Sequence, residues 1–117
     1  MKNNFCKLNI IKKHKGIKNG ITWNNLTFTG TSTITFNSNL ACSGLLTLGS
    51  GAVTTTLNND GTTRTITASG GITFAGSNGF TAGSANIKAT GGTITSASNT
   101  NTLKNNLEIA GNVTFGS

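Results

Sequence analysis

The stretch NLTFTGTSTITF at residues 25–36 contains the pattern that decides the fold. It holds two short segments, Leu26-Thr27-Phe28 and Ile34-Thr35-Phe36, in which apolar and hydroxyl side chains alternate. Strict alternation predicts a β-strand with one buried face. Gly30 and its polar neighbours separate the two segments, so the stretch indicates two strands joined by a corner.

The same two-segment pattern recurs at a period of roughly 20 residues. Segments aligned with 26–28 are 46–48, 65–68, 86–89 and 107–109, and those aligned with 34–36 are 53–55, 72–74, 94–96 and 113–115. A fixed period with two short strands per unit is typical of solenoids, whose turns bury their apolar side against the next turn. We therefore predict an all-β, right-handed, single-stranded parallel β-solenoid (β-helix) of about five rungs over residues 26–117.

The alternation also predicts which side chains point into the solenoid. The expected inward residues are Leu26, Phe28, Ile34, Phe36, Leu40, Leu46, Leu48, Val53, Ile66, Ala68, Ile72, Phe74, Phe80, Ile87, Ala89, Ile94, Leu103, Leu107, Ile109, Val113 and Phe115. Cys42 alternates with Leu40 and is expected to pack inward as a small hydrophobe. A third wall is predicted from Leu40, Leu57, Phe80 and Leu103, whose spacing is less regular.

Residues 1–25 form a basic segment that is predicted to be a degenerate capping rung. Leu8-Asn9-Ile10 alternates and precedes Leu26-Thr27-Phe28 by nearly one period. An amphipathic helix over 5–14 is the alternative for this piece. The net charge of +7 comes mainly from this segment, which carries Lys2, Lys7, Lys12, Lys13, Lys15 and Lys18.

A run of lysines is typical of a solvated, charged cap, and it also favours weak attraction to anionic surfaces. The segment has no Arg and one aromatic residue, Phe5. Because guanidinium forks and stacking platforms are missing, specific nucleic-acid binding is not expected.

The residues that carry chemistry are few, and we predict no catalytic, cofactor-binding or metal-binding residues. Asp60 and Glu108 are the two carboxylates and are expected on different faces, whereas paired-carboxylate hydrolysis needs two within about 10 Å. His14 is the single histidine, and Cys6 and Cys42 lie too far apart in sequence for a metal motif. The chain is therefore expected not to be an enzyme.

The two ends of the sequence suggest where partners bind. Residues 113–117 stop midway round a predicted rung without a capping charge, so the C-terminal end is expected to pair with further rungs or with copies of the same chain. The N-terminus lacks the uninterrupted apolar run of a signal peptide, and no stretch is long enough to span a bilayer.

The repeat unit resembles those of secreted bacterial β-helices, namely autotransporter passenger domains and filamentous-haemagglutinin-like adhesins. The stretches that carry the resemblance are 25–30, 44–51, 71–76 and 106–111. The resemblance implies a rigid stalk or passenger, a cell-surface or extracellular location, and a host-surface or glycan ligand. It also implies that the chain is a segment of a larger protein.

Two other functions remain open. Ice-binding solenoids present outward threonine arrays, and the repeat here predicts one such ladder from Thr35, Thr54, Thr73, Thr95 and Thr114. The neighbouring predicted column is Thr33, Ala52, Gly71, Thr93 and Asn112, which contains few threonines, so threonine as a strand former on a solvated face is the favoured interpretation. The other alternative is a segment of a phage or viral fibre.

Overall fold

The computed structural model describes residues 7–10, 14–15, 22–28, 33–51, 55–76, 80–81, 85–98, 103 and 105–116. Within these ranges the chain is all-β and every strand pairing is parallel. The same ranges hold no helix long and apolar enough to cross a membrane.

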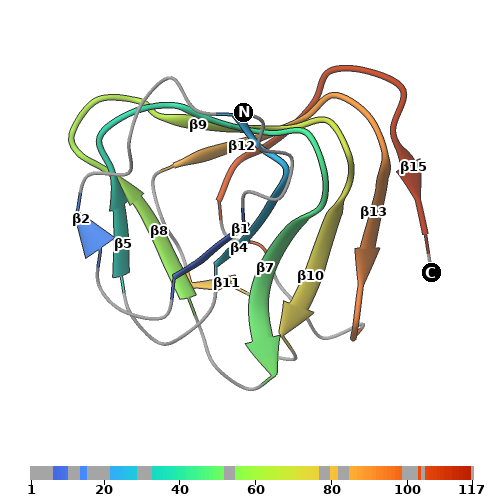
Figure 1. The fold of residues 1–117 in the computed structure, drawn as a ribbon, viewed down its shortest axis with the longest axis horizontal. Helices are drawn as coiled ribbons and strands as arrows, with labels where there is room; N and C mark the ends of the chain where they lie inside the picture. Colours follow the sequence, from blue (N-terminus) through green and yellow to red (C-terminus); the bar gives the residue numbers. More distant parts are fainter. Residues whose placement is uncertain are drawn as a thin grey trace.

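The strands form three sheets, which are the three walls of the stack (Figure 1). The first sheet has the order β1 (Lys7–Ile10), β4 (Asn25–Phe28), β7 (Leu46–Gly51), β10 (Ile72–Gly76), β13 (Thr93–Ser96) and β15 (Thr114–Phe115). The second has β11 (Phe80–Thr81), β8 (Thr55–Asn59), β5 (Thr33–Phe36) and β2 (His14–Lys15). The third has β14 (Leu107–Ile109), β12 (Asn86–Ala89), β9 (Thr65–Ala68), β6 (Leu40–Cys42) and β3 (Thr22–Trp23).

From β1 to β13, consecutive strands visit the three sheets in turn, which is the winding of a β-solenoid, and β14 and β15 then extend the third and first sheets. β4, β5 and β6 make one turn, β7 to β9 the next, and β10 to β12 a third (Figure 1). The predicted solenoid fold is therefore confirmed at the level of parallel strands stacked in successive turns. Its core has about three turns, fewer than the about five rungs predicted.

The two predicted columns are wrong, because each mixes strands from different walls. Leu26 pairs with Leu46 as expected, but Leu46 then pairs with Ile72, and Ile72 with Ile94. Ile66, which the repeat aligned with Leu46, instead lies on the third sheet. The turn between β7 and β10 contains the long strand β8 and the corner at 60–64. Because this turn is longer than one sequence period, the segment that follows β7 by one period lies on the third sheet and not on the first.

The third wall exists, but its members differ from those predicted. Leu40 is in register with Ile66, and Ile66 with Ile87, in the third sheet. Leu57 belongs to the second sheet, where it pairs with Ile34. Alternation within a strand gave the correct facing of these side chains but could not say which strands stack.

The core lies between the three sheets. Its fully buried side chains include Phe28 and Phe36, whose rings meet edge to face with centroids 5.4 Å apart. Burial is confirmed for the predicted inward residues Leu26, Phe28, Ile34, Phe36, Leu40, Leu46, Leu48, Ile66, Ala68, Ile72, Ile87, Ala89 and Ile94, and for Cys42. Phe74, Leu103, Leu107 and Val113 are partly buried against this core.

Ile109 and Phe115 were predicted to be inward but are exposed, at 44% and 67%. They lie on β14 and β15, which among the described strands are paired on one side only. Val53 and the side chain of Phe80 lie outside the described residues.

The N-terminal strand continues the first sheet. Leu8 pairs with Leu26 and Ile10 with Phe28, in the register that the sequence spacing predicts. The helical alternative for residues 5–14 is therefore wrong for Lys7–Ile10. The capping role of residues 1–25 stays a prediction.

Candidate functional site

The five threonines of the predicted ladder do not share one column. Thr73 pairs with Thr95 in the first sheet, but Thr35 lies on the second sheet opposite Asn58. Thr114 pairs with Thr93 and so belongs to a neighbouring column, and Thr54 lies outside the described residues. The error follows from the change of wall between β7 and β10.

A different threonine column runs across the outer face of the first sheet. Thr27 pairs with Thr47, Thr47 with Thr73, and Thr73 with Thr95. The first three lie between apolar residues, whereas Thr95 lies between buried Ile94 and exposed Ser96. All four are partly exposed, and the Oγ1 atoms of Thr73 and Thr95 are 3.2 Å apart. Because neighbouring strands are spaced by ~4.8 Å, the hydroxyl and methyl groups of this column repeat at about that interval.

The residues beside this column interrupt any second row. Two positions earlier in the sequence are Asn25 and Thr93, which lie on β4 and β13, and Leu45 and Gly71, which directly precede β7 and β10. Leu45 is 41% exposed, and Gly71 has no side chain. Among these four described positions, Thr93 beside Thr95 is the one that places a threonine next to the column.

A polar hollow of about 250 Å³ lies on the outer face of the third sheet. It is lined by residues of β9, β12 and β14 and by the residue before β14, namely Thr65, Asn86, Ile87, Lys88, Asn106, Leu107 and Glu108. Register places these side chains together, since Asn86 pairs with Thr65 and Lys88 with Glu108. We call this hollow the polar groove.

Two side-chain contacts cross the polar groove. Asn106 Nδ2 donates to Asn86 Oδ1 at 3.2 Å. Lys88 Nζ lies 3.7 Å from Glu108 Oε1, with side chains 39% and 64% exposed. Among the described residues that line the groove, the charges of Lys88 and Glu108 are opposite and balance each other.

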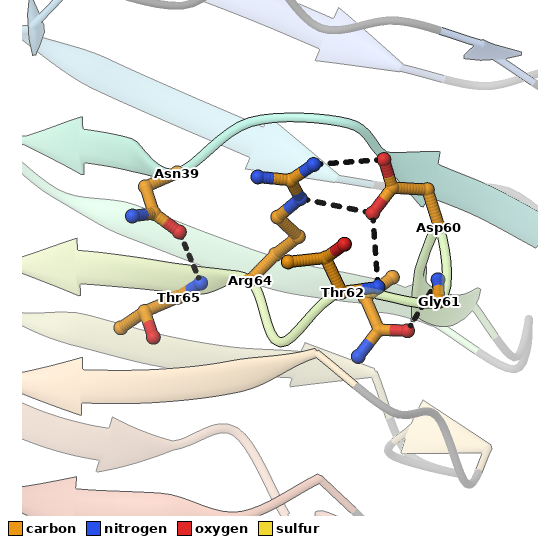
Figure 2. A network of polar contacts seen from close by, with 7 residues as sticks. Asn39, Asp60, Gly61, Thr62, Arg64 and Thr65 are labelled. Carbon is orange, nitrogen blue, oxygen red and sulfur yellow. Dashed lines mark hydrogen bonds and ion pairs between the residues drawn. The ribbon is translucent and has the colours of Figure 1, made fainter.

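The corner between β8 and β9 holds the second ion pair (Figure 2). Arg64 donates from Nε and Nη2 to the two carboxylate oxygens of Asp60, at 2.9 and 2.8 Å. Asp60 also accepts from the Thr62 amide, and Asn39 accepts from the Thr65 amide, as Figure 2 shows. The hydrogen bonds from Arg64 lower the pKa of Asp60 to about 2, so the carboxylate stays ionised and serves to fix the corner.

Of the remaining chemically reactive groups, Cys42 is the one whose contacts the structure describes. The Cys42 thiol is buried and donates to the Asn24 carbonyl at 3.4 Å, and burial raises its pKa. Only the strand position of His14 is described, and Cys6 lies outside the described residues. In the described part of the chain, no three His, Cys, Asp or Glu residues gather in a group that could hold a metal ion.

The outer edges of β14 and β15 form a further candidate surface. Among the described strands, nothing pairs with these edges, so their backbone donors and acceptors face outwards. Phe115 pairs with Ile94 of the preceding turn, and Ile109 pairs with Ala89. Ile94 and Ala89 are buried, whereas Phe115 and Ile109 are exposed. One more turn placed on this edge would bury Phe115 and Ile109 in the same way.

Comparisons with known proteins assign no family: no protein-family model, no curated protein and no solved structure matches this chain. Function is therefore argued from the geometry above.

Sequence reasoning did not identify the polar groove. A signal was present, because Lys88 and Glu108 are the middle residues of two repeat segments that do stack. The sequence did not indicate that β12 and β14 pair in the third sheet, and this pairing is what brings Asn86 and Asn106 next to each other.

Proposed function

We propose that this chain is a non-enzymatic, structural and adhesive β-solenoid segment of a larger cell-surface or secreted protein. The resemblance of its repeats to bacterial β-helix passengers and adhesins supports the location. Connections between parallel strands are right-handed in about 98% of cases, which supports a right-handed coil. The proposal also includes further rungs, to a total of about five.

Rigidity is supported by hydrogen bonds that continue between turns beyond the strands. At the corner after the third sheet, the amides of Ser69, Thr90 and Ala110 donate to carbonyls of the preceding turn at 3.0, 2.8 and 2.8 Å. A corner that is hydrogen-bonded from turn to turn resists bending, because bending would separate donors from acceptors in a region with little side-chain packing. This property suits a stalk.

The observation that carries the proposal is the C-terminal edge. Phe115 and Ile109 are exposed where the equivalent residues one turn earlier are buried. Unpaired parallel strands with apolar residues template the addition of another strand. The proposed partners are therefore further solenoid rungs or copies of this chain, with weak anionic-surface attraction of the lysine-rich N-terminal segment as a secondary contact.

A non-catalytic role is supported by the state of the two carboxylates. Asp60 is held by Arg64 at the corner between β8 and β9, and Glu108 lies against Lys88 on the third sheet. Neither contact supplies the pair of carboxylates that glycoside hydrolysis requires.

Sedimentation of the chain tests the proposal. We expect association that grows with protein concentration and with salt, because salt screens repulsion between the lysine-rich segments. Phe115→Asp should weaken the association, whereas Leu45→Asp, which changes an exposed apolar residue away from the edge, should not. A stable monomer at high concentration and high salt, or equal loss in both variants, would contradict the proposal.

A second candidate, ice binding, is favoured by the column Thr27, Thr47, Thr73 and Thr95. Such a function needs a flat array, so replacing Thr47 by Lys should abolish any depression of the freezing point below the melting point. Absence of that depression in the wild-type chain would remove this candidate. The phage or viral fibre alternative has no observation that favours it over the first proposal.

A further inference from the structure

We propose that the polar groove on the third sheet binds an uncharged sugar ring, such as one pyranose unit of a glycan. The inference rests on the adhesive role proposed above and deepens it by naming one site and the chemical class of its ligand. It rests on the juxtaposition of Thr65, Asn86 and Asn106 along one row with Lys88 and Glu108 along the next.

Unused hydrogen-bonding capacity in the groove identifies the kind of ligand. The Asn106–Asn86 contact uses one donor of Asn106 and the Oδ1 acceptor of Asn86. Among the described residues, the Nδ2 group of Asn86 and the Oδ1 atom of Asn106 have no further partner. The groove therefore presents amide donors and an amide acceptor side by side, and a hydroxyl can both donate and accept.

The pairing of Lys88 with Glu108 favours an uncharged ligand over a charged one. An anionic ligand would meet Glu108, and a cationic one would meet Lys88, while their mutual pairing leaves no net charge. A molecule with several neutral hydroxyls satisfies the amides without disturbing the ion pair. No aromatic residue is among the described residues that line the groove, so the proposed binding rests on hydrogen bonds rather than on stacking.

The groove is preorganised by the sheet beneath it. Asn86 and Lys88 lie on β12, which is paired on one side with β9 and on the other with β14. Side chains on the same face of neighbouring strands repeat at ~4.8 Å, which holds the polar rows at a fixed separation. Little ordering of the protein is needed on binding, which lowers the free-energy cost of association.

The test is a titration of the isotopically labelled chain with methyl glucoside, followed by NMR of the asparagine side-chain amides. We expect saturable shifts of the Asn86 and Asn106 signals. Asn106→Ala should weaken binding by about fivefold or more, since a hydrogen bond to a neutral group is lost. Asn112→Ala, an exposed asparagine outside the groove, is the matched control and should bind like the wild type.

A second variant separates groove binding from damage to the fold. Glu108→Gln keeps the shape of the groove and leaves Lys88 without its ion pair, so methyl glucuronide should bind to this variant and not to the wild type. The proposal is overturned if the glucoside produces no saturable shift, if Asn112→Ala loses binding as Asn106→Ala does, or if glucuronide binding is unchanged by Glu108→Gln. It is also overturned if free glycine shifts the amide signals as strongly, because recognition would then be by charge.

Discussion

Ile72 stacks on Leu46 in the first sheet, although the sequence repeat assigns these two residues to different columns. Ile94 covers the other side of Ile72, and the side chain of Ile72 is fully buried. The next residue, Thr73, points to the outer face beside Thr95. This pair of adjacent residues therefore has opposite environments.

Replacing Ile72 by Asp should destabilise the fold far more than replacing Thr73 by Asp. An unpaired charge at a fully buried position should lower the free energy of unfolding by about 4 kcal/mol or more. At Thr73 the loss should be about 1 kcal/mol, from the contact with Thr95. Thermal melts of the two variants followed by far-ultraviolet circular dichroism measure the difference. Equal melting temperatures would mean that the facing of β10 is wrong, since a slip of one residue exchanges the two faces.

Two glycines with positive φ provide a test of how closely the turns stack. Gly92 has φ 77°, and a Cβ there would meet the backbone of Gly70 and Gly71 one turn earlier. Gly61 has φ 97°, with nothing within 4 Å of a Cβ. Gly61→Ala should cost about 1–2 kcal/mol from the left-handed backbone alone.

Gly92→Ala carries the same backbone cost and adds about 1–3 kcal/mol of steric strain between turns. Urea unfolding of the two variants gives the comparison. If Gly61→Ala proves as destabilising as Gly92→Ala, the corner after the third sheet is more open than described.

Stability should depend on pH through Asp60. Its pKa is lowered from 3.8 to about 2 by the hydrogen bonds from Arg64, so the folded state binds this proton less tightly than the unfolded state does. The stabilisation is therefore fully present above pH 3.8 and is lost as the pH falls towards 2. The difference in melting temperature between the wild type and Asp60→Asn should be constant at neutral pH and shrink across this window. A difference that is unchanged at pH 2 would show that the carboxylate is not the group responsible.

Asn105 should contribute to stability from inside the solenoid. Its Nδ2 group donates to the carbonyls of Leu57 and Ala85, at 3.1 and 2.8 Å, and the residue is buried. Asn105→Ala leaves these two acceptors without that donor and should cost about 1–3 kcal/mol. Asn112→Ala, at an exposed position, should cost less than about 0.5 kcal/mol. Chemical unfolding that ranks the two variants equally would contradict the role of Asn105.

The facing of side chains was predictable from the sequence, whereas the stacking of strands was not. Phe28 and Ile87 could be placed in the core because apolar residues alternate with polar ones within each strand. Which strand lies next to which depends on the length of each turn, and the turn that contains β8 and Asp60 is longer than its neighbours. The predicted threonine ladder failed for this reason.

The exposed C-terminal edge could be predicted from the sequence, whereas the polar groove could not. An unpaired C-terminal end was expected from the sequence, although Phe115 and Ile109 were assigned to the interior. The groove depends on Asn86 and Asn106 being neighbours across two strands, which becomes visible only when β12 and β14 are placed on the same sheet.

NMR contacts between backbone protons of neighbouring strands report how the chain winds through the three sheets. The three-walled fold predicts contacts between Leu46 and Ile72 and between Leu40 and Ile66. Contacts between Leu46 and Ile66, with Ile72 next to Val53, would instead show a two-column solenoid and would contradict the three-walled fold, the threonine column and the polar groove together.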